Sequence, residues 1–332
     1  MPAAVPGGAR RRRAFDIVGV GANTLDHVCV LPHPLIGDRK VELRAYEQLP
    51  GGQVPTALVA LQRWGMRTAY LGAFADDAGG ELQRASLTDA GVDVTFSRPR
   101  RGAASQTSII LVDALTGERA IAWRRPAGLA LRADELDPRP FEATRAVLLD
   151  ADDAETALRA AALARAANAL VMLDVDEPGP HTGELLALAD VAIVPTGFAQ
   201  RATGAAELGT ALRRLVFCGP RLAVTTLGAG GALACRAGRL LHVPAVPAPV
   251  VDTTSAGDCF HAGCLYGLLQ RWPLHRTLRF AAAAAALACT RLGGRPSVPE
   301  LSAVLDLLQR GDAKPRRRWR LRASTLKGGA AR

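Results

Sequence analysis

The alternation of short apolar runs with helix-length segments between residues 143 and 194 constrains the fold more than any other feature of the sequence. It predicts, in order, strand 146–149, helix 154–167, strand 170–174, helix 182–188 and strand 191–194. Strands that are joined by helices of this length run parallel, with right-handed crossovers. The chain is therefore expected to have an α/β fold built on a doubly wound, mainly parallel sheet.

The same organisation extends to both sides of this segment. Residues 15–21 form a continuous apolar run that ends in glycine, which is typical of a central strand covered on both faces. Toward the C-terminus the sequence predicts a buried strand, an antiparallel hairpin and three closing helices, at 222–226, at 232–235 with 240–243, and at 256–270, 273–292 and 298–309. One large domain with a small elaboration accounts for these elements better than two equal domains do.

Two intervals depart from this organisation and supply the elaboration. Residues 31–49 carry prolines and a glycine between short alternating stretches, which favours edge strands over a core element. Residues 105–123 contain two apolar runs around a polar turn at 113–118, which predicts a hairpin. We expect the two intervals to form a small β sheet that projects from the main domain.

The net charge of +10 raises the question of nucleic-acid binding, so its distribution along the chain matters. Twelve of the 41 basic residues lie near the ends, in runs without acidic residues: Arg10, Arg11, Arg12, Arg13, Lys314, Arg316, Arg317, Arg318, Arg320, Arg322, Lys327 and Arg332. The rest of the chain contains 29 basic and 31 acidic residues, so its net charge is close to zero. We therefore expect no nucleic-acid partner, a domain at 15–312, and disordered basic tails at 1–14 and 313–332. A polyanion-binding tail is the alternative, because Trp319 lies in the C-terminal basic run.

The cysteines and the apolar runs indicate where the chain resides. Six cysteines are scattered without a C-x-x-C pair or a His/Cys cluster at metal-ligand spacing: Cys29, Cys218, Cys235, Cys259, Cys264 and Cys289. We expect them to be buried, reduced thiols, which predicts a cytoplasmic protein. The N-terminal residues lack the apolar stretch of a signal peptide, and the most apolar run, 280–289, is too short to span a bilayer. No membrane partner is expected.

The strongest chemical signal is the sequence D-T-T-S-A-G-D at residues 252–258, at the start of a predicted helix. Small side chains at Ser255, Ala256 and Gly257 would leave backbone amides exposed at the positive end of the helix dipole, where a phosphoryl group could bind. Asp258, in the first turn, could accept the proton of an attacking hydroxyl. An ordinary helix start, in which Ser255 caps the helix and Asp258 occupies a favourable acidic position, explains the spacing equally well.

This segment resembles the D-T-x-G-A-G-D signature of the ribokinase-like (PfkB) carbohydrate kinases, with Ser255 in place of the first glycine. Four further segments are similar to motifs of that family and follow in the same order. They are 21–26 (first strand end), 50–65 (the G-G-x-x-x-N-x-A signature), 226–231 (the nucleotide-side T-x-G-x-x-G turn) and 295–299 (the closing loop). The resemblance extends from residue 15 to about residue 309, and the ordered set is more specific than any single motif.

The resemblance implies an ATP-dependent sugar kinase, with Mg²⁺ bridging the ATP phosphates. It implies that the small β sheet is a lid over the sugar, that K⁺ binds as in many members, and that homodimers form. The resemblance implies Asp258 as general base, with the backbone of Ser255, Ala256 and Gly257 as anion hole. The implied acceptor residues are Asp26, Gly51, Gly52, Gln53 and Thr56. Those implied for ATP are Thr226, Gly228 and Gly231, and those for the monovalent cation are Asp252, Thr254 and Ser297, through backbone or side-chain oxygens.

Three further positions depart from the family pattern. The family's N-x-x-E motif, which helps to organise Mg²⁺, is replaced by Thr196 and Ala199, and Thr56 stands where an asparagine is usual. A missing carboxylate removes an acceptor for the waters of the metal. Asp174 and Asp176 are candidates to compensate for it.

The sequence thus leaves several interpretations open. The chain is an active sugar kinase, a nucleoside kinase of the same family, or a kinase-like binding or regulatory protein that has lost turnover. His261 is expected to be packed rather than catalytic. Trp123 is expected to be a packed hairpin aromatic, with stacking on a sugar as the alternative.

Overall fold

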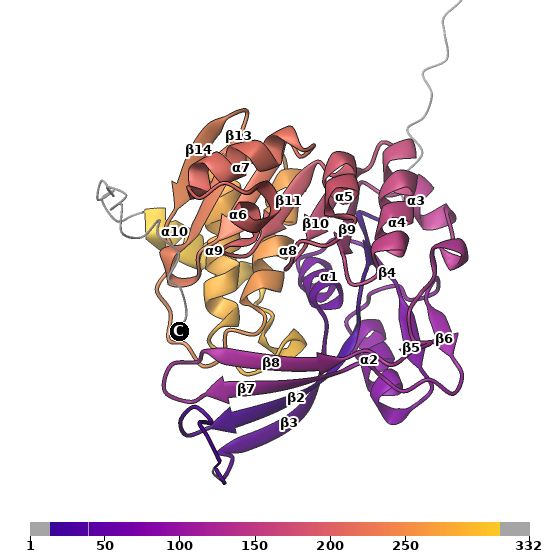
Figure 1. Ribbon diagram of the computed structural model, residues 1–332, viewed down its shortest axis with the longest axis vertical. Coiled ribbons are helices and arrows are strands. Elements are labelled where there is room, and N and C mark those ends of the chain that lie inside the picture. The colour runs from indigo at the N-terminus through magenta and orange to yellow at the C-terminus, as the bar shows by residue number, and fades with distance from the viewer. Residues whose placement is uncertain (1–13, 39, 313–332) are drawn as a thin grey trace, which may run out of the picture.

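The computed structural model describes residues 14–38 and 40–312. Its centre is an eight-stranded sheet (Figure 1). In spatial order the strands are β14 (Arg239–Val243), β13 (Ala232–Arg236), β12 (Leu222–Thr226), β11 (Val191–Val194), β10 (Leu170–Asp174), β9 (Ala146–Asp150), β1 (Ile17–Val20) and β4 (Thr68–Leu71). All neighbours are parallel except at β13, which pairs antiparallel with β12 and with β14. Apart from Ala14, the expected basic tails at 1–14 and 313–332 lie outside the described residues.

Helices cover both faces of this sheet, which confirms the predicted doubly wound α/β fold. One face carries α1 (Gln53–Arg63), α8 (Ala256–Leu269), α9 (Leu274–Ala288) and α10 (Leu301–Asp312). The other carries α3 (Arg139–Glu142), α4 (Ala154–Ala166), α5 (Thr182–Leu188), α6 (Phe198–Thr203) and α7 (Leu208–Phe217). Each face has its own apolar cluster, and successive strand residues alternate between them: Ile17 belongs to one cluster and Val18 to the other.

The helices form where apolar spacing and capping residues agree. In α7, Leu208, Ala211, Leu212 and Leu215 are buried, which is the i, i+3, i+4, i+7 pattern of a helix with one apolar face. The helix α4 begins after Asp153, whose carboxylate accepts a hydrogen bond from the backbone amide of Thr156. Both helices therefore pack one face on the sheet and expose the other.

A separate four-stranded sheet lies beside the main body, below it in Figure 1. Its strands, in spatial order, are β3 (Ala45–Gly51), β2 (Thr24–Leu31), β7 (Thr107–Asp113) and β8 (Arg119–Arg124). The hairpin of β7 and β8 is the predicted one. The predicted first interval, 31–49, was too short, because β2 precedes it and is a central strand of this small sheet.

The interval from residue 68 to residue 104 contains elements that were not predicted from the sequence. After β4, the short strand β5 (Ala73–Ala75) pairs in parallel with β6 (Arg98–Arg100). Between them lies α2 (Ala78–Asp89), capped by Asp77, which accepts a hydrogen bond from the amide of Gly80. Three 3₁₀ turns complete the described elements: η1 (Ala133–Glu135), η2 (Gly228–Gly230) and η3 (Arg295–Ser297).

In the part of the chain that the structure describes, no helix combines the length and apolarity needed to cross a bilayer. The six cysteines are free. Cys235, Cys259 and Cys264 are buried, as predicted, whereas Cys218 is exposed, so the expectation of buried thiols is wrong for that residue.

Candidate active site

The candidate active site lies where the carboxyl ends of the parallel strands meet the first turns of α1 and α8. Strand β1 pairs with β4 on one side and with β9 on the other. Helix α1, before β4, packs on one face of the sheet, and α4, after β9, packs on the opposite face. A crevice therefore opens between β1 and β9, where α/β sheets commonly bind ligands.

Asp258 occupies the first turn of α8. The residue is partly buried, and burial raises the pKa of its carboxyl well above the ordinary value. Negative charges on Asp174, Asp176 and Asp26 raise this pKa further, while the guanidinium of Arg119 opposes the shift. A carboxylate with a raised pKa is a stronger proton acceptor, which suits a general base.

The turn before Asp258 leaves backbone amides free. Ser255 is the N-cap residue of α8, yet its side chain makes no capping hydrogen bond and its hydroxyl contacts that of Ser297 instead. The ordinary capping interpretation is therefore wrong. The amide of Ala256 donates to the Thr253 carbonyl over 3.3 Å, whereas the amides of Gly257 and Asp258 have no partner among residues 14–38 and 40–312. No atom lies within 4 Å of where a Gly257 side chain would begin, so there is open space beside this turn.

On the acceptor side, Asp26 lies in β2 and is 4% exposed. The hydroxyl of Thr24 donates to its Oδ1 over 2.7 Å. Burial raises the pKa of Asp26, and hydrogen bonds from Thr24 and Ser108 oppose this, as does the charge of Arg295. The carboxylate is thus held between neighbouring strands close to the start of α1.

Two glycines allow the start of α1 to approach Asp26. A Cβ on Gly51 would lie 1.9 Å from Asp26 Oδ2. Gly52 has φ +97°, and a Cβ there would lie 2.4 Å from the carbonyl oxygen of Ala22. Any side chain at either position would displace the carboxylate or the backbone of the β1–β2 connection.

Gln53 and Thr56 follow on α1. The Gln53 side-chain amide donates to Asp176 Oδ2 over 2.8 Å and approaches Asp174 Oδ1 at 3.4 Å. Thr56 is fully buried, and its hydroxyl has no hydrogen-bond partner in the described part of the chain. The structure therefore connects the predicted acceptor residues to two carboxylates at the end of β10.

The predicted nucleotide-side residues gather at the end of β12. The hydroxyl of Thr196 donates to the carbonyl of Thr226 over 2.8 Å. Gly228 has φ +53° and open space beside it. Gly231 has φ +88°, and a Cβ there would lie 2.1 Å from the Val243 carbonyl oxygen, so its approach to the end of β14 requires glycine on packing grounds.

The altered N-x-x-E positions supply no carboxylate. Ala199 is buried in the apolar cluster beneath α6. Asp174, at the end of β10, is 3% exposed, and burial raises its pKa to about 6. Its Oδ2 is buried without a partner, and its Oδ1 lies 3.2 Å from Nε2 of His261. Asp174 therefore offers an unsatisfied carboxylate oxygen near Asp258.

The side chains predicted to hold a monovalent cation are engaged with protein donors. Asp252 Oδ1 accepts hydrogen bonds from the amide and the hydroxyl of Thr254, at 2.9 and 2.5 Å, and Oδ2 accepts one from the amide of Gly293 at 2.8 Å. The Ser297 hydroxyl donates to the Gly294 carbonyl and contacts Ser255. These side-chain oxygens thus have protein partners, and the K⁺ site, through side-chain or backbone oxygens of the three residues, stays a prediction.

The small sheet contacts the segment before α8 through its β7–β8 turn. The amide of Thr253 donates to the Gly117 carbonyl over 3.2 Å, and Arg119 Nη1 donates to the Thr253 hydroxyl over 3.1 Å. Trp123, farther along β8, is 61% exposed. The prediction that Trp123 is a packed hairpin aromatic is therefore wrong.

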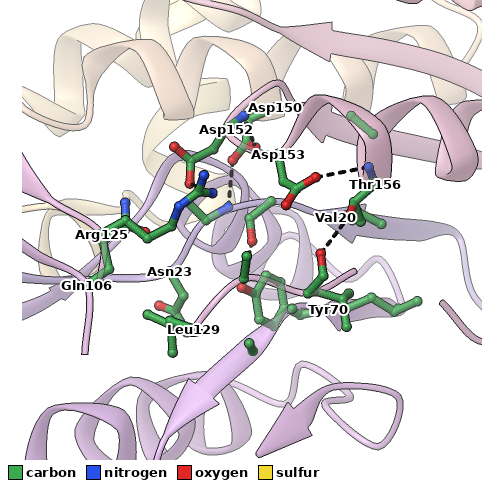
Figure 2. Close-up of a pocket in the computed structure, with 18 residues that line it drawn as sticks. Val20, Asn23, Tyr70, Gln106, Arg125, Leu129, Asp150, Asp152, Asp153 and Thr156 are labelled. Carbon is green, nitrogen blue, oxygen red and sulfur yellow. Dashed lines mark hydrogen bonds and ion pairs between the residues drawn. The ribbon is translucent and has the colours of Figure 1, made fainter. Parts of the chain in front are cut away.

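A cavity lies beside the acceptor residues, at the carboxyl ends of β1, β4 and β9 (Figure 2). Arg125 and Asp152 form an ion pair of 2.8 Å at its edge, and Asp150 Oδ2 accepts the amide of Ala22. Burial, followed by the charge of Asp152, raises the pKa of Asp150 to about 8. Asn23 lines the cavity, and its Nδ2 is buried without a partner in the described chain. Of these residues, only Ala22 and Asn23 lie in a segment that the sequence singled out, 21–26, and neither was assigned a role.

Comparison with known proteins identifies the family. The model of the pfkB family of carbohydrate kinases matches residues 16–301. The chain is 31% identical over 293 residues to aminoimidazole riboside kinase of Salmonella typhimurium, covering 80% of this chain and 91% of that protein. It is 26% identical over 300 residues to ribokinase of Haemophilus influenzae, covering 87% and 97%. Its fold is similar to that of a fructokinase with bound ATP from Xylella fastidiosa, with a TM-score of 0.76, 25% identity, and coverage of 90% and 99%. The chain therefore belongs to the pfkB family and is an ATP-dependent carbohydrate kinase.

Proposed function

We propose that the chain transfers the terminal phosphoryl group of ATP to a hydroxyl of a sugar or riboside, with Asp258 as general base. One observation carries this proposal: the carboxylate with the raised pKa directly follows Gly257, whose amide is free. Base and anion-binding amides are thus fixed next to each other at the start of one helix. The first amides of any helix lack an intrahelical acceptor, so the combination that matters is free amides beside a buried carboxylate at the carboxyl edge of the sheet.

Different residues would bind the acceptor, take its proton and stabilise the transferred phosphoryl group. Asp26 and the start of α1 would hold the acceptor through hydrogen bonds to its hydroxyls, which fixes the attacking oxygen near Asp258. Asp258 would take the proton of this hydroxyl as it attacks. The amides of Gly257 and Asp258 would donate to oxygens of the transferred phosphoryl group.

Asp174 and Asp176 are the residues that we propose for Mg²⁺. Asp174 Oδ2 is buried without a partner, and Asp176 lies beside it at the Gln53 amide. Bound Mg²⁺ supplies positive charge to the ATP phosphates. Among the described residues no group of three His, Cys, Asp or Glu side chains could hold a metal, and two carboxylates suit an ion that keeps waters and phosphate oxygens as ligands. The pair thereby takes the place of the glutamate that is absent at Ala199.

The small sheet would serve as a lid. Its β7–β8 turn is hydrogen-bonded to Thr253, five residues before Asp258, so movement of the sheet would open or close the site. The small sheet exposes Tyr46 and Ile109 on the face that also carries His27, and Ile121 and Trp123 on the opposite face, in register with Val28 and Asp26. We propose that the face with Tyr46 and Ile109 forms the homodimer interface, because exposed apolar side chains favour association.

The cavity beside Asn23 favours a riboside as a second candidate acceptor. It adjoins the acceptor residues and offers the Asn23 amide, Asp150 and the Arg125–Asp152 pair to polar atoms of a group attached to the sugar. The Salmonella relative is named for an aminoimidazole riboside. The alternative of a binding protein without turnover gains no support, since Asp258 and the free amides are in place.

An ADP-release assay over D-ribose, D-fructose and aminoimidazole riboside tests this proposal. At least one acceptor is expected to give turnover that depends on both ATP and Asp258. The absence of Asp258-dependent turnover with every acceptor would contradict the proposal.

A further inference from the structure

We propose that Arg295 is a positioning residue for the acceptor, holding Gly51 and Asn23 in place around Asp26. The residue lies in η3, in the loop after α9, and its side chain reaches the β1–β2 connection and the end of β3. The inference rests on the proposed function, because it assigns Arg295 to acceptor binding at that same site.

The contacts of Arg295 converge on one place. Its Nη2 donates to the Gly51 carbonyl over 2.7 Å and also contacts Oδ1 of Asn23. Its Nη1 donates to the Gln83 carbonyl, in α2, over 3.0 Å. A single side chain thus connects three segments that are remote in sequence, and two of these segments carry or adjoin acceptor residues.

Gly51 lies between Arg295 and Asp26. Its carbonyl accepts from the guanidinium, and its α-carbon lies so close to the carboxylate that a Cβ would be 1.9 Å from Asp26 Oδ2. The contact with Arg295 fixes the orientation of the Gly51 peptide. It therefore also fixes the direction in which Gly52 and Gln53 enter α1.

The guanidinium of Arg295 lies in surroundings that destabilise a buried positive charge, which is unexpected for a residue that only packs. Arg295 is 3% exposed, its Nε is buried without a partner, and in the described chain it forms no ion pair within 4 Å. Its direct partners are neutral oxygens. Burial lowers its pKa to about 10, and Tyr70, followed by the charges of Asp26 and Asp258, opposes this shift. A buried cation without a paired anion is destabilising, which favours a functional reason for its presence.

The carboxylates that face this cation belong to the proposed site. Arg295 offsets the cost of keeping Asp26 negative in a buried position, and a negative Asp26 makes the strongest hydrogen bonds to acceptor hydroxyls. Loss of the guanidinium should therefore weaken acceptor binding through geometry and charge together. ATP binding should be spared, because no contact of Arg295 lies on the nucleotide side.

The test compares Arg295→Met, Arg295→Lys and a matched control, Arg63→Met. Arg63 holds the same closing loop, through the Val298 carbonyl at 2.5 Å, but it contacts none of the acceptor residues. With D-ribose, D-fructose and aminoimidazole riboside, we expect Arg295→Met to raise the acceptor KM about tenfold or more, equivalent to about 1.4 kcal/mol. The ATP KM should be unchanged and kcat should change less. Arg295→Lys keeps the charge but not the forked geometry and should be intermediate.

A second measurement needs no turnover. The rise in Tm caused by each acceptor is expected to shrink in Arg295→Met and to persist in Arg63→Met. A double variant with Asp26→Asn should lose less acceptor binding than the two single losses added together, because both act on one site. If Arg295→Met fails to fold, Arg295→Lys provides the same comparison.

The outcomes separate this inference from the proposed function. No Asp258-dependent turnover by the wild type overturns the proposed function, and the acceptor-induced Tm shifts then decide the role of Arg295. Acceptor KM values and Tm shifts for Arg295→Met that match those of Arg63→Met overturn the inference. So does the absence of an acceptor-induced Tm shift with every acceptor in the wild type.

Discussion

His261 lies 3.2 Å from Asp174, measured from Nε2 to Oδ1. The same nitrogen also lies 3.2 Å from the carbonyl oxygen of Ile193. Its other ring nitrogen, Nδ1, lies 2.8 Å from the carbonyl oxygen of Gly257, one turn earlier in α8. The ring connects the proposed metal carboxylate to the start of the helix that carries Asp258. His261 is thus packed, as expected, but it also links two parts of the site.

The negative charge of Asp174 leads to a prediction about how the reaction rate depends on pH. Because Asp258 must be deprotonated to act as a base, and because its pKa is raised, kcat/KM for the acceptor should fall as the pH falls through that pKa. Asp174 is the foremost of the neighbouring charges that raise it. Asp174→Asn should therefore move the acid limb of the pH–rate profile to lower pH, with a lower maximum rate if Mg²⁺ binding weakens.

The control for this pH experiment is Asp306→Asn, an exposed position on α10. Its profile should coincide with that of the wild type. A profile for Asp174→Asn that is unmoved, or that moves to higher pH, would show that Asp174 does not set the pKa of the base.

Substitution of Gly51 tests the acceptor geometry. A Cβ in Gly51→Ala would meet Asp26 Oδ2 at 1.9 Å, so the carboxylate or the start of α1 must move. We expect the acceptor KM to rise at least about tenfold. Displacement of a positioning group by about 1 Å can lower an enzyme's rate on the order of 10²-fold. Gly179→Ala, where no atom lies within 4 Å of the added Cβ, is the control. Steady-state kinetics that show equal acceptor KM values for the two variants would argue against Asp26 as an acceptor ligand.

The lid contact gives a third prediction. Arg119→Met removes the hydrogen bond from β8 to Thr253 and a positive charge that lowers the pKa of Asp258. We expect kcat to fall several-fold and the pKa of Asp258 to rise, which moves the acid limb to higher pH. Arg124→Met changes the same charge on the same strand without this contact. If both variants have the same kcat and the same profile, the hairpin contact has no role in turnover.

Helix packing gives a prediction about stability. Gly263 in α8 faces α9, and a Cβ there would lie 2.6 Å from the α-carbon of Ala281. Gly263→Ala should lower the free energy of unfolding by about 1–3 kcal/mol, because the two helices must separate. Gly183→Ala, in α5 with open space around the added Cβ, should leave the stability unchanged or raise it. Denaturant unfolding of both variants measures the difference, and an equally stable Gly263→Ala would refute the close approach.

The main sheet could be predicted from the sequence because its strands are continuous apolar runs. Strands β10, β11 and β12 and helix α5 begin and end where predicted. By contrast, β2 was not assigned to the small sheet, because it continues almost directly from β1 and only its pairing with β3 and β7 separates the two. Helix α2 was not predicted, since two glycines follow its first residue, Ala78, and it buries few side chains.

The site was predictable where a motif fixed it locally and not where it depends on distant contacts. Asp258 and the free amides around Gly257 belong to one short segment. Arg295 contacts Gln83, Gly51 and Asn23, at sequence separations of 212, 244 and 272 residues. The sequence marked Arg295 only as the first residue of the closing loop and could not show these contacts. The partnership of Gln53 with Asp176 likewise depends on the fold, with a separation of 123 residues.

The rate of ATP-dependent phosphorylation by Asp258→Asn, compared with the wild type on the best acceptor, tests the central claim most directly. The account predicts a loss of about 10²–10⁴-fold in kcat, the usual contribution of a general base, with ATP still raising Tm as in the wild type. A variant that binds ATP and retains the wild-type kcat would contradict the assignment of Asp258 as the catalytic base.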